Sequence, residues 1–281
     1  MVDYHSDRDH VSRSDLALFD WSRSAYKRRQ DNPDLNVDDD KTELKIGTGT
    51  HAVTLKVATE LDKVKLIPAA ALNSAGHKKG NNWTRFRLNS ENRGKTLLLP
   101  KQWELCQQVG AALEAVELAQ TAGGEPITIG KLVKDPRAER ELEWRWTDVL
   151  PCRIKADLVI PLPNEIICID LKTARSVDER QFRTEIKERK LWLQVAHYSA
   201  GLEDKYDRPV RFVFAAVEKK FPHKADVFEL EPETVAIAKL GRLALLEQLK
   251  QCRESGRFID PPRDTGIKRV RLTAADMGVA V

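Results

Sequence analysis

The sequence lacks long hydrophobic segments and has few cysteines. No apolar run approaches the roughly 20 residues that a membrane-spanning helix requires, and the N-terminal residues MVDYHSDRDHVSRSD contain no apolar signal segment. The cysteines form no CxxC pair, which argues against a zinc or iron–sulfur site and for a reducing compartment. They are Cys106, Cys152, Cys168 and Cys252. We therefore expect a cytoplasmic protein that does not associate with a membrane.

Positive charge is concentrated in one segment of the chain. The net charge of +4 over 281 residues is only a weak sign of nucleic-acid binding, and the 41% hydrophobic content supports a proper core. Residues 77–95, however, hold six Lys or Arg against one Glu. Cations mixed with aromatic residues suit phosphate contacts and base stacking, whereas a solvated, mobile loop is the alternative. The predicted DNA contacts here are Lys78, Lys79, Trp83, Arg85 and Arg87.

Alternation of residue type predicts three consecutive β-strands within residues 142–172. Successive side chains of a strand point to opposite faces, so residues two apart share a face. The expected apolar faces are Leu142, Trp144 and Trp146 on the first strand, Cys152, Ile154, Ala156, Leu158 and Ile160 on the second, and Ile167, Ile169 and Leu171 on the third. Turn-forming residues at 161–164 allow the second and third strands to pair as neighbours.

The opposite faces of these strands carry acidic residues. Asp157 on the second strand and Asp170 on the third can meet across the pair, with Lys172 two residues further on. A carboxylate between apolar neighbours usually has a cation or a partner, and Mg²⁺ prefers carboxylate and carbonyl oxygens. We therefore predict that these three residues form the core of a nuclease metal site. In the alternative, the acids pair with Arg153, Lys155 and Lys172 on a solvated face.

Two further residues could join this site. Glu143 lies on the polar face of the first strand and is a candidate ligand or base, although a solvent-facing position on an edge strand is an equal alternative. His51 follows Gly47 and Gly49 in a helix that we expect to begin near residue 50. A neutral imidazole can approach a metal ion if the fold brings it to the acid pair. Otherwise His51 is an ordinary core or surface histidine.

The N-terminal segment predicts a helix with a phosphate-binding end. Ser12 or Ser14 can cap a helix whose apolar side contains Leu16, Phe19 and Ala25. A helix N-terminus with free N–H groups and hydroxyls binds phosphate well. Ser12, Arg13 and Ser14 are therefore candidate phosphate contacts, with simple helix capping as the alternative.

Helical spacing predicts further helices around the strands. Residues 101–121 form one, ended by Gly123 and Gly124, and residues 174–203 are also helical, with Gln194 and Tyr198 on one face. A β-forming run follows Pro209, and a last helix spans residues 233–257. We expect one α/β domain over residues 1–260, with a core at about 127–220 and helical additions at the front, and then a basic tail over 261–281.

The order of these motifs resembles the PD-(D/E)XK nuclease superfamily in its RecB-type form. The matching residues are Gly47-Thr48-Gly49-Thr50-His51, Asp157, Asp170-Leu171-Lys172-Thr173, Gln194 and Tyr198, with smaller matches at VSRSDL, GKTLLL, CRIKAD and IDLKT. The resemblance is greatest to the RecE-type exonucleases of phages and prophages, the exodeoxyribonuclease VIII family, and covers residues 4–202. Two departures are Asp170 in place of Glu, and Ala156 in place of the Pro that commonly precedes the first Asp.

This resemblance implies a fold and a role for each matched residue. The fold is a central mixed β-sheet flanked by helices. Asp157, Asp170, the Leu171 carbonyl and His51 are implied as ligands of Mg²⁺, for which Mn²⁺ can substitute. Lys172 is implied to orient or polarise the attacking water. Gln194 and Tyr198 are implied to position the substrate or brace the site.

The resemblance also implies an activity and partners. We expect a metal-dependent exonuclease that degrades linear double-stranded DNA from 5′ to 3′ and leaves 3′ single-stranded tails for homologous recombination. A ring-shaped trimer or tetramer, a single-strand annealing protein as partner, and the cytosol of a bacterial host are further expectations. The alternatives are an endonuclease or repair nuclease with the same core, and a non-catalytic DNA-binding protein of the same fold.

Overall fold

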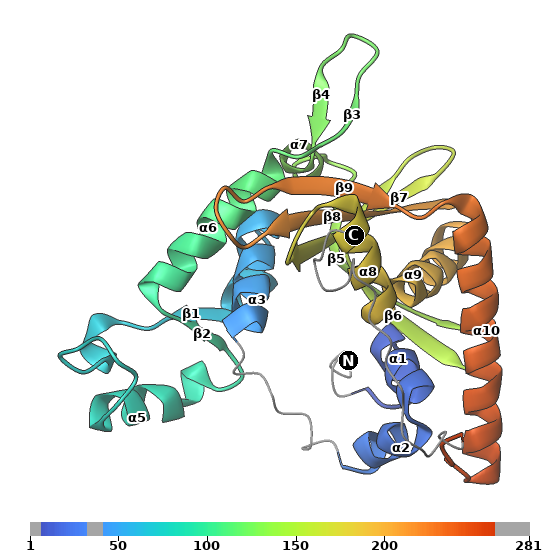
Figure 1. The fold of residues 1–281 in the computed structure, drawn as a ribbon, viewed down its shortest axis with the longest axis horizontal. Helices are drawn as coiled ribbons and strands as arrows, with labels where there is room; N and C mark the ends of the chain where they lie inside the picture. The colour runs from blue at the N-terminus through green and yellow to red at the C-terminus, as the bar shows by residue number, and fades with distance from the viewer. Residues whose placement is uncertain (1–6, 33–41, 262–281) are drawn as a thin grey trace, which may run out of the picture.

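The centre of the molecule is a five-stranded mixed β-sheet with the strand order β5-β6-β7-β8-β9 (Figure 1). The computed structural model describes residues 7–32 and 42–261. The predicted C-terminal tail over 261–281 therefore lies outside the described residues, except for residue 261. The strands are β5 (Glu139–Thr147), β6 (Pro151–Pro161), β7 (Ile166–Ala174), β8 (Val210–Glu218) and β9 (Ala225–Glu229). Within this sheet the β7–β8 pair is parallel, and the β5–β6, β6–β7 and β8–β9 pairs are antiparallel. The predicted strands are confirmed, and β9 is an additional one.

Helices cover both faces of this sheet and enclose two hydrophobic cores. One face carries α1 (Arg13–Trp21), α8 (Glu179–Glu188), α9 (Leu191–Tyr206) and α10 (Pro232–Ser255) over what we call the first core. The other face carries α3 (Thr42–Leu55), α6 (Pro100–Glu114) and α7 (Ile129–Val133) over the second core. The predicted α/β fold, a mixed sheet flanked by helices, is confirmed. Among the described helices, none is both long enough and apolar enough to cross a membrane.

Strand β6 changes face at Asp157. The first core contains Cys152, Ile154, Ala156 and Val159, whereas the second core contains Leu158 and Ile160. In the β5–β6 pair, Leu142 lies opposite Ala156 and Arg140 opposite Leu158, while Glu141 between them has a φ of +54°. The prediction of one continuous apolar face on β6 is therefore wrong beyond Ala156, because strict alternation cannot anticipate an irregular residue pair. The predicted faces of β5 and β7 are confirmed.

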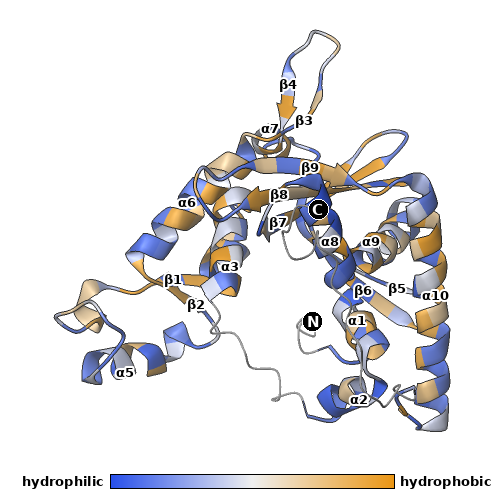
Figure 2. Cartoon of the chain, viewed as in Figure 1, coloured by the Kyte–Doolittle hydropathy of each residue, from blue (hydrophilic) through white to orange (hydrophobic). Residues whose placement is uncertain are grey.

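The N-terminal helix is divided in two. Ser12 caps α1 in a reciprocal capping box with Asp15, so Ser12 rather than Ser14 is the cap. Ser22 has an extended backbone, ends α1 and accepts a hydrogen bond from the Ala25 backbone as the cap of α2 (Arg23–Asp31). Figure 2 shows that α2 is largely hydrophilic, in keeping with Tyr26 as its buried residue. The prediction of one continuous helix is wrong because a capping serine in its interior starts a second helix.

Helix α3 includes the glycines that were expected to precede it. It begins at Thr42 among the described residues, so Gly47 and Gly49 lie within it. A Cβ atom at Gly49 would lie 2.5 Å from Cys106 Sγ, so this glycine permits close packing of α3 on α6. Packing rather than helix entry therefore explains Gly49.

Two other predicted helices have different bounds. Helix α6 ends at Glu114, and β3 (Glu117–Gln120) and β4 (Pro126–Thr128) then form a hairpin whose turn contains Gly123 and Gly124. The helix predicted to residue 121 is thus wrong over residues 115–121, since pairing with a later strand overrides local propensity. The helical stretch 174–203 is divided into α8 and α9 at Lys190, which has a left-handed backbone.

A buried histidine joins α9 and α10 to β6. His197 is fully buried, its Nδ1 accepts a hydrogen bond from Arg242 Nε at 3.1 Å, and its Nε2 lies 3.1 Å from the Arg153 carbonyl. A carbonyl only accepts, so Nε2 donates and the imidazole is neutral. Burial, reinforced by the charge of Arg242, lowers the pKa of His197 to about 3.

We predict that Gly49→Ala destabilises the protein by about 1–3 kcal/mol, whereas Gly47→Ala leaves stability unchanged or raises it by up to about 1 kcal/mol. The added methyl group would overlap Cys106 at position 49, but at position 47 its nearest neighbour is Thr173 Oγ1 at 3.5 Å. Urea denaturation of both variants and the wild type measures the difference. Equal stability of the two variants would contradict the close contact between α3 and α6.

We also predict that His197 makes stability fall in mild acid. The folded pKa of about 3 lies below the unfolded value near 6.5, so this contribution is complete above pH 6.5 and is lost as the pH falls toward 3. At pH 5 the loss amounts to about 2 kcal/mol. His197→Gln lacks this titration, so its free energy of unfolding should fall less between pH 7.5 and 5. Parallel losses in the variant and the wild type would refute the assignment.

Candidate functional site

A cavity of about 470 Å³ lies between α1, α3 and α9 at the point where β6 and β7 separate. The last paired residues before the separation are Leu158 and Ile169. The predicted site residues that line the cavity are Ser12, Arg13, Ser14, His51, Asp157, Lys172, Gln194 and Tyr198. Segments that are far apart in the sequence therefore meet at one place, as the predicted site requires.

The two predicted aspartates occupy different positions where β6 and β7 separate. We call this place, with Asp157, Asp170, Leu171 and His51, the metal corner. Asp157 Oδ2 accepts a hydrogen bond of 2.9 Å from the Leu171 backbone N–H. Asp170 is 3% exposed, its Oδ1 accepts a hydrogen bond of 2.6 Å from Gln194 Nε2, and its Oδ2 forms an ion pair with Lys172. Burial raises the pKa of Asp157, an effect that the charge of Asp170 reinforces and that of His51 opposes. A cation near Asp157 would favour its ionised form.

His51 reaches the same corner from α3. Its Nε2 lies 2.8 Å from the Leu171 carbonyl oxygen, and its Nδ1 lies 3.7 Å from Asp157 Oδ1. The imidazole therefore touches two of the other three groups in the predicted ligand set. The placement of His51 beside the acid pair agrees with the prediction.

The donor chemistry of this corner suits a hard divalent cation, but its atoms have protein partners. Two carboxylates, a backbone carbonyl and an imidazole are present. In the described part of the chain, however, no group of three or more His, Cys, Asp or Glu side chains is close enough to share an ion. A metal would have to replace the contact of His51 with Leu171 and that of Lys172 with Asp170. These donor atoms therefore suit a divalent cation, and a bound cation could replace the polar contacts that they now make with other protein groups.

One wall of the cavity is built from a cluster of buried ion pairs that sequence reasoning missed. Glu141 accepts from Lys155 at 3.0 Å and from Lys63 at 3.2 Å, and Lys63 also pairs with Glu60 of α4 (Ala58–Asp62). Burial opposes ionisation of Glu141, but its bonds to Thr59 and Lys155 lower its pKa below the ordinary value. Lys155 lies two residues before Asp157, so its place on the same face of β6 could have been predicted. Glu60, Lys63 and Glu141 come from distant segments and could not.

Glu143 is not brought into the cavity. Its carboxylate lies 3.5 Å from Lys155, its side chain is 35% exposed, and the cavity is lined by Glu141 instead. The left-handed backbone at Glu141 changes which residue of β5 points toward Asp157. The expectation that Glu143 shares the site is therefore corrected in favour of Glu141.

The opposite wall is rich in arginine. Within the described residues, the buried Nε atoms of Arg8, Arg13 and Arg29 have no hydrogen-bond partner. Arg13 Nη2 lies 3.4 Å from Gln194 Oε1, which links α1 to the residue that holds Asp170. An anion in the cavity could satisfy these donors.

The predicted phosphate contacts on α1 divide into two roles. The Ser12 hydroxyl is engaged with Asp15 in the capping box, so for Ser12 the capping alternative holds. Ser14 is exposed and lines the cavity in the first turn of α1, and Arg13 lines it as well. Arg13 and Ser14 therefore stay available to an anion.

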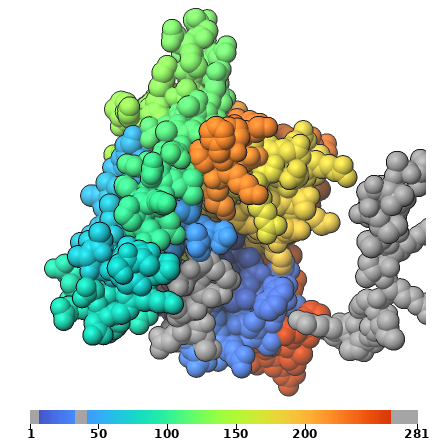
Figure 3. All heavy atoms as spheres, turned by 60° about the vertical axis from the view of Figure 1, so that its left-hand side comes forward, coloured from blue at the N-terminus to red at the C-terminus, as the bar shows by residue number. Residues whose placement is uncertain are grey.

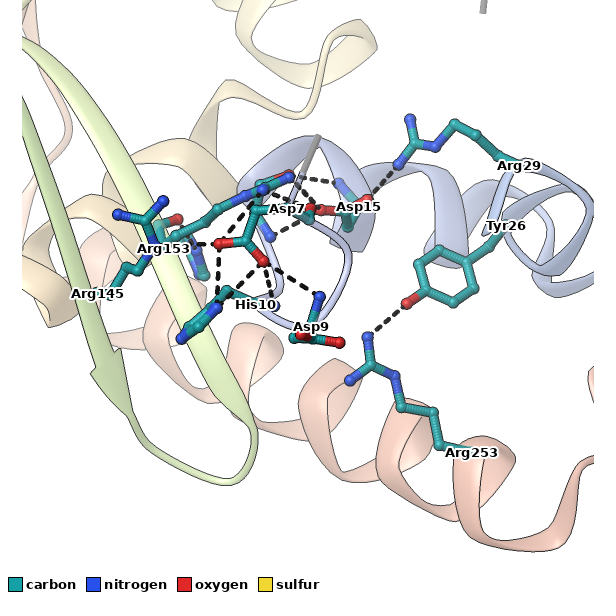
Figure 4. Close-up of polar contacts among 11 residues, drawn as sticks. Asp7, Asp9, His10, Asp15, Tyr26, Arg29, Arg145, Arg153 and Arg253 are labelled. Carbon is teal, nitrogen blue, oxygen red and sulfur yellow. Dashed lines mark hydrogen bonds and ion pairs between the residues drawn. The ribbon is translucent and has the colours of Figure 1, made fainter. Parts of the chain in front are cut away.

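Buried carboxylates hold the N-terminal segment against β6 (Figure 4). Asp7 accepts from Arg145 Nε at 3.0 Å, and Arg153 donates to the Asp7 backbone carbonyl. Asp15 accepts from Arg29 at 2.5 Å. Burial alone would raise the pKa of Asp7, but hydrogen bonds from the His10 backbone and Arg145 lower it well below its usual range. Two arginines of the cavity lining, Arg29 and Arg153, are thus held in place by Asp15 and by the Asp7 backbone.

The charge of the whole cavity is positive. Its basic lining residues are Arg8, Arg13, Arg29, Lys63, Arg153, Lys155, Lys172 and Arg189, and its acidic ones are Asp15, Glu60, Glu141 and Asp157. Positively charged walls around a carboxylate corner favour a phosphate-containing ligand.

The predicted basic segment lies outside this cavity. Its centre forms the helix α5 (Asn81–Leu88), and the cavity lining includes none of Lys78, Lys79, Trp83, Arg85 and Arg87. These residues therefore belong to a separate surface (Figure 1).

The chain matches a family model and is similar to solved structures. Residues 25–261 match a family described as "PDDEXK-like domain of unknown function". No curated protein matches. A solved structure from Eubacterium rectale, described as a "putative exonuclease", is 10% identical, with 97% of this chain and 94% of that chain covered at a TM-score of 0.53, which shows a shared fold. The structure of SSO0001 is 18% identical over 41% of this chain and 53% of that chain, and its TM-score of 0.25 carries no argument.

Proposed function

Because the chain belongs to the family of PDDEXK-like domains, we propose that it is a nuclease that hydrolyses phosphodiester bonds with the help of a divalent metal. Membership of the PD-(D/E)XK superfamily is as predicted, whereas the particular closeness to the RecE type remains a prediction. One observation carries the proposal. His51, Asp157 and Lys172 line one positively charged cavity, and directly behind them the buried Asp170 contacts Lys172 and the Leu171 carbonyl contacts His51.

Each group in this corner has a proposed task. Asp157, Asp170, the Leu171 carbonyl and His51 would hold Mg²⁺, with Mn²⁺ as a substitute. The ion, when bound, polarises the phosphodiester and supplies a nucleophilic water at neutral pH. Lys172 is fixed beside Asp170, where its positive charge can orient the water and stabilise charge that develops on the phosphate.

Residues behind these groups keep them in place. Gln194 donates to Asp170 Oδ1 at 2.6 Å, and Arg13 donates to Gln194 at 3.4 Å. Tyr198 lies one helical turn from Gln194 and lines the cavity, which suits a contact with the substrate. Gln194 is therefore a positioning residue in this proposal.

The arginine wall supports DNA ends as the substrate. The donors of Arg8, Arg13 and Arg29 suit a terminal phosphate, which carries nearly two charges at neutral pH. Together with the resemblance to RecE-type enzymes, this leads us to propose 5′-to-3′ digestion of linear double-stranded DNA, yielding 3′ tails for homologous recombination. A ring-shaped trimer or tetramer, an annealing protein as partner, and a phage- or prophage-encoded enzyme in the bacterial cytoplasm are proposals from the same resemblance.

A second candidate is a non-catalytic DNA-binding protein of the same fold. The internal pairing of every predicted ligand, together with the missing three-residue ligand group among the described residues, favours it. An endonuclease with the same core would share the metal corner and would differ in accepting DNA without ends.

We predict that Asp170→Asn and Lys172→Met each lower the rate of DNA hydrolysis by at least about 100-fold, because the first removes a ligand charge that would hold the metal and the second removes the cation that would stabilise charge on the phosphate. The substrate is 5′-phosphorylated linear duplex DNA with Mg²⁺, and closed circular DNA is the matched control substrate. Glu143→Gln should stay within a few-fold of the wild type, since Glu143 does not line the cavity. Equal rates in all proteins would contradict the active site, and cleavage of the circle would contradict the exonuclease assignment.

We also predict that Mn²⁺ stabilises the wild type without any DNA. Binding to the folded state adds about 2.7 kcal/mol when the free ion is at 100 times its Kd. Asp157→Asn and Asp170→Asn should abolish the resulting rise in Tm, and Glu143→Gln should keep it. If both aspartate variants respond to Mn²⁺ like the wild type, the ion binds somewhere else.

A further inference from the structure

The basic segment forms an arm that begins at the rim of the cavity. Lys63 lines the cavity, and β1 (Val64–Leu66) starts at the next residue and pairs with β2 (Thr96–Leu98). Residues 67–95 between these strands, which we call the arm, contain α5 and two short 3-10 helices. Lys95 closes the arm by an ion pair of 2.6 Å with Asp62, and the Thr96 N–H donates to the Lys63 carbonyl at 2.7 Å. The root of the arm is therefore fixed beside the cavity.

The arm extends away from the sheet. In Figure 1, α5 lies far from the central strands, and Figure 3 shows the arm as a lobe at the lower left of that view. Helix α5 packs on the two 3-10 helices of the arm itself, Ala69–Ala71 and Ser90–Asn92. The surface of the arm that faces away from the sheet is therefore accessible to a binding partner.

Two aromatic residues lie next to each other on α5. The rings of Trp83 and Phe86 are 6.1 Å apart, both side chains are half-buried, and Lys78 Nζ lies 5.7 Å from the centre of the Trp83 ring. Asn92 is buried and donates to the Phe86 carbonyl at 2.7 Å. Trp83 therefore contacts Phe86 and Lys78 within the arm, and the base stacking expected from the sequence stays a prediction.

The outer surface of the arm carries positive charge. Lys79, Arg85, Arg87 and Arg93 are exposed, and none of them forms an ion pair with another residue in the described ranges. Glu91 is the one acidic residue between positions 67 and 95. Arg85 and Arg87 are two residues apart and so point to different sides of α5. Cations spread around a helix suit a row of phosphates better than a single small anion.

We propose that the arm binds the phosphate backbone of the duplex whose end enters the cavity, and so keeps the enzyme on its DNA between cleavages. This inference rests on the proposed nuclease function. The three residues of β1 span only about 10 Å, so the arm begins within one helical turn of duplex from Lys63. Backbone contacts fit the observed surface because its cations Lys79, Arg85, Arg87 and Arg93 are exposed, whereas the rings of Trp83 and Phe86 are half-buried.

The test compares two variants that each lose three exposed cations. The arm variant is Lys79→Ala/Arg85→Ala/Arg87→Ala. The matched control is Lys131→Ala/Lys134→Ala/Arg137→Ala, in and just after α7, outside the cavity lining. Affinity for a 40-base-pair duplex is measured at several salt concentrations in EDTA, so that no cleavage occurs. Circular dichroism and Tm confirm that both variants are folded.

We expect the arm variant to bind more weakly and with a smaller dependence on salt. Loss of three phosphate contacts lowers the slope of log K against log salt by about 2–3, whereas the control should match the wild type. An unchanged slope in the arm variant, or an equal decrease in the control, would overturn the proposal. Because the measurement is made without hydrolysis, failure of the wild type to cleave DNA would remove the proposed nuclease function and leave the result for the arm intact.

Discussion

The hydrogen bond from the Leu171 N–H to Asp157 Oδ2 is the interaction on which the site depends. The regular pairing of β6 and β7 ends at Leu158 and Ile169, and beyond that point the strands separate. A carboxylate takes the place of the missing backbone partner and so ends the ladder without leaving a buried N–H group unsatisfied. The same bond fixes Asp157 next to Asp170 and leaves the Leu171 carbonyl facing His51. The same hydrogen bond therefore ends the pairing of β6 and β7 and positions the candidate metal ligands.

The rest of the molecule supplies charge and rigidity to this feature. The buried carboxylates of Asp7 and Asp15 form ion pairs with Arg153 and Arg29, so two cations of the cavity lining stay ordered. On the far side of β6, neutral His197 fixes the Arg153 backbone and is itself held by Arg242. Buried ion pairs of this kind contribute little net stability, because desolvation offsets their attraction. Their effect here is to position cations where a phosphate can reach them.

The parts of the structure that follow from local chemistry were predictable. Alternation gives β5 and β7, a β-forming run after Pro209 gives β8, and the serines at 12 and 14 indicate the start of α1. The features that sequence could not supply depend on irregular backbone or on distant pairing. Glu141 replaces Glu143 because its φ is positive, β6 changes face at Asp157, and a hairpin strand takes up most of the last two predicted turns of α6. The approach of His51 to Leu171 depends on the packing of α3 and was open until the fold was known.

The central claim is that Asp157, Asp170, Leu171 and His51 together form a metal site. The most direct measurement is anomalous diffraction from crystals grown with Mn²⁺ and a 5′-phosphorylated duplex. The account predicts an anomalous peak within bonding distance of both aspartates and the Leu171 carbonyl, with His51 Nε2 and Lys172 moved from their present partners. A structure in which those partners are unchanged and the Mn²⁺ peaks lie elsewhere would contradict it.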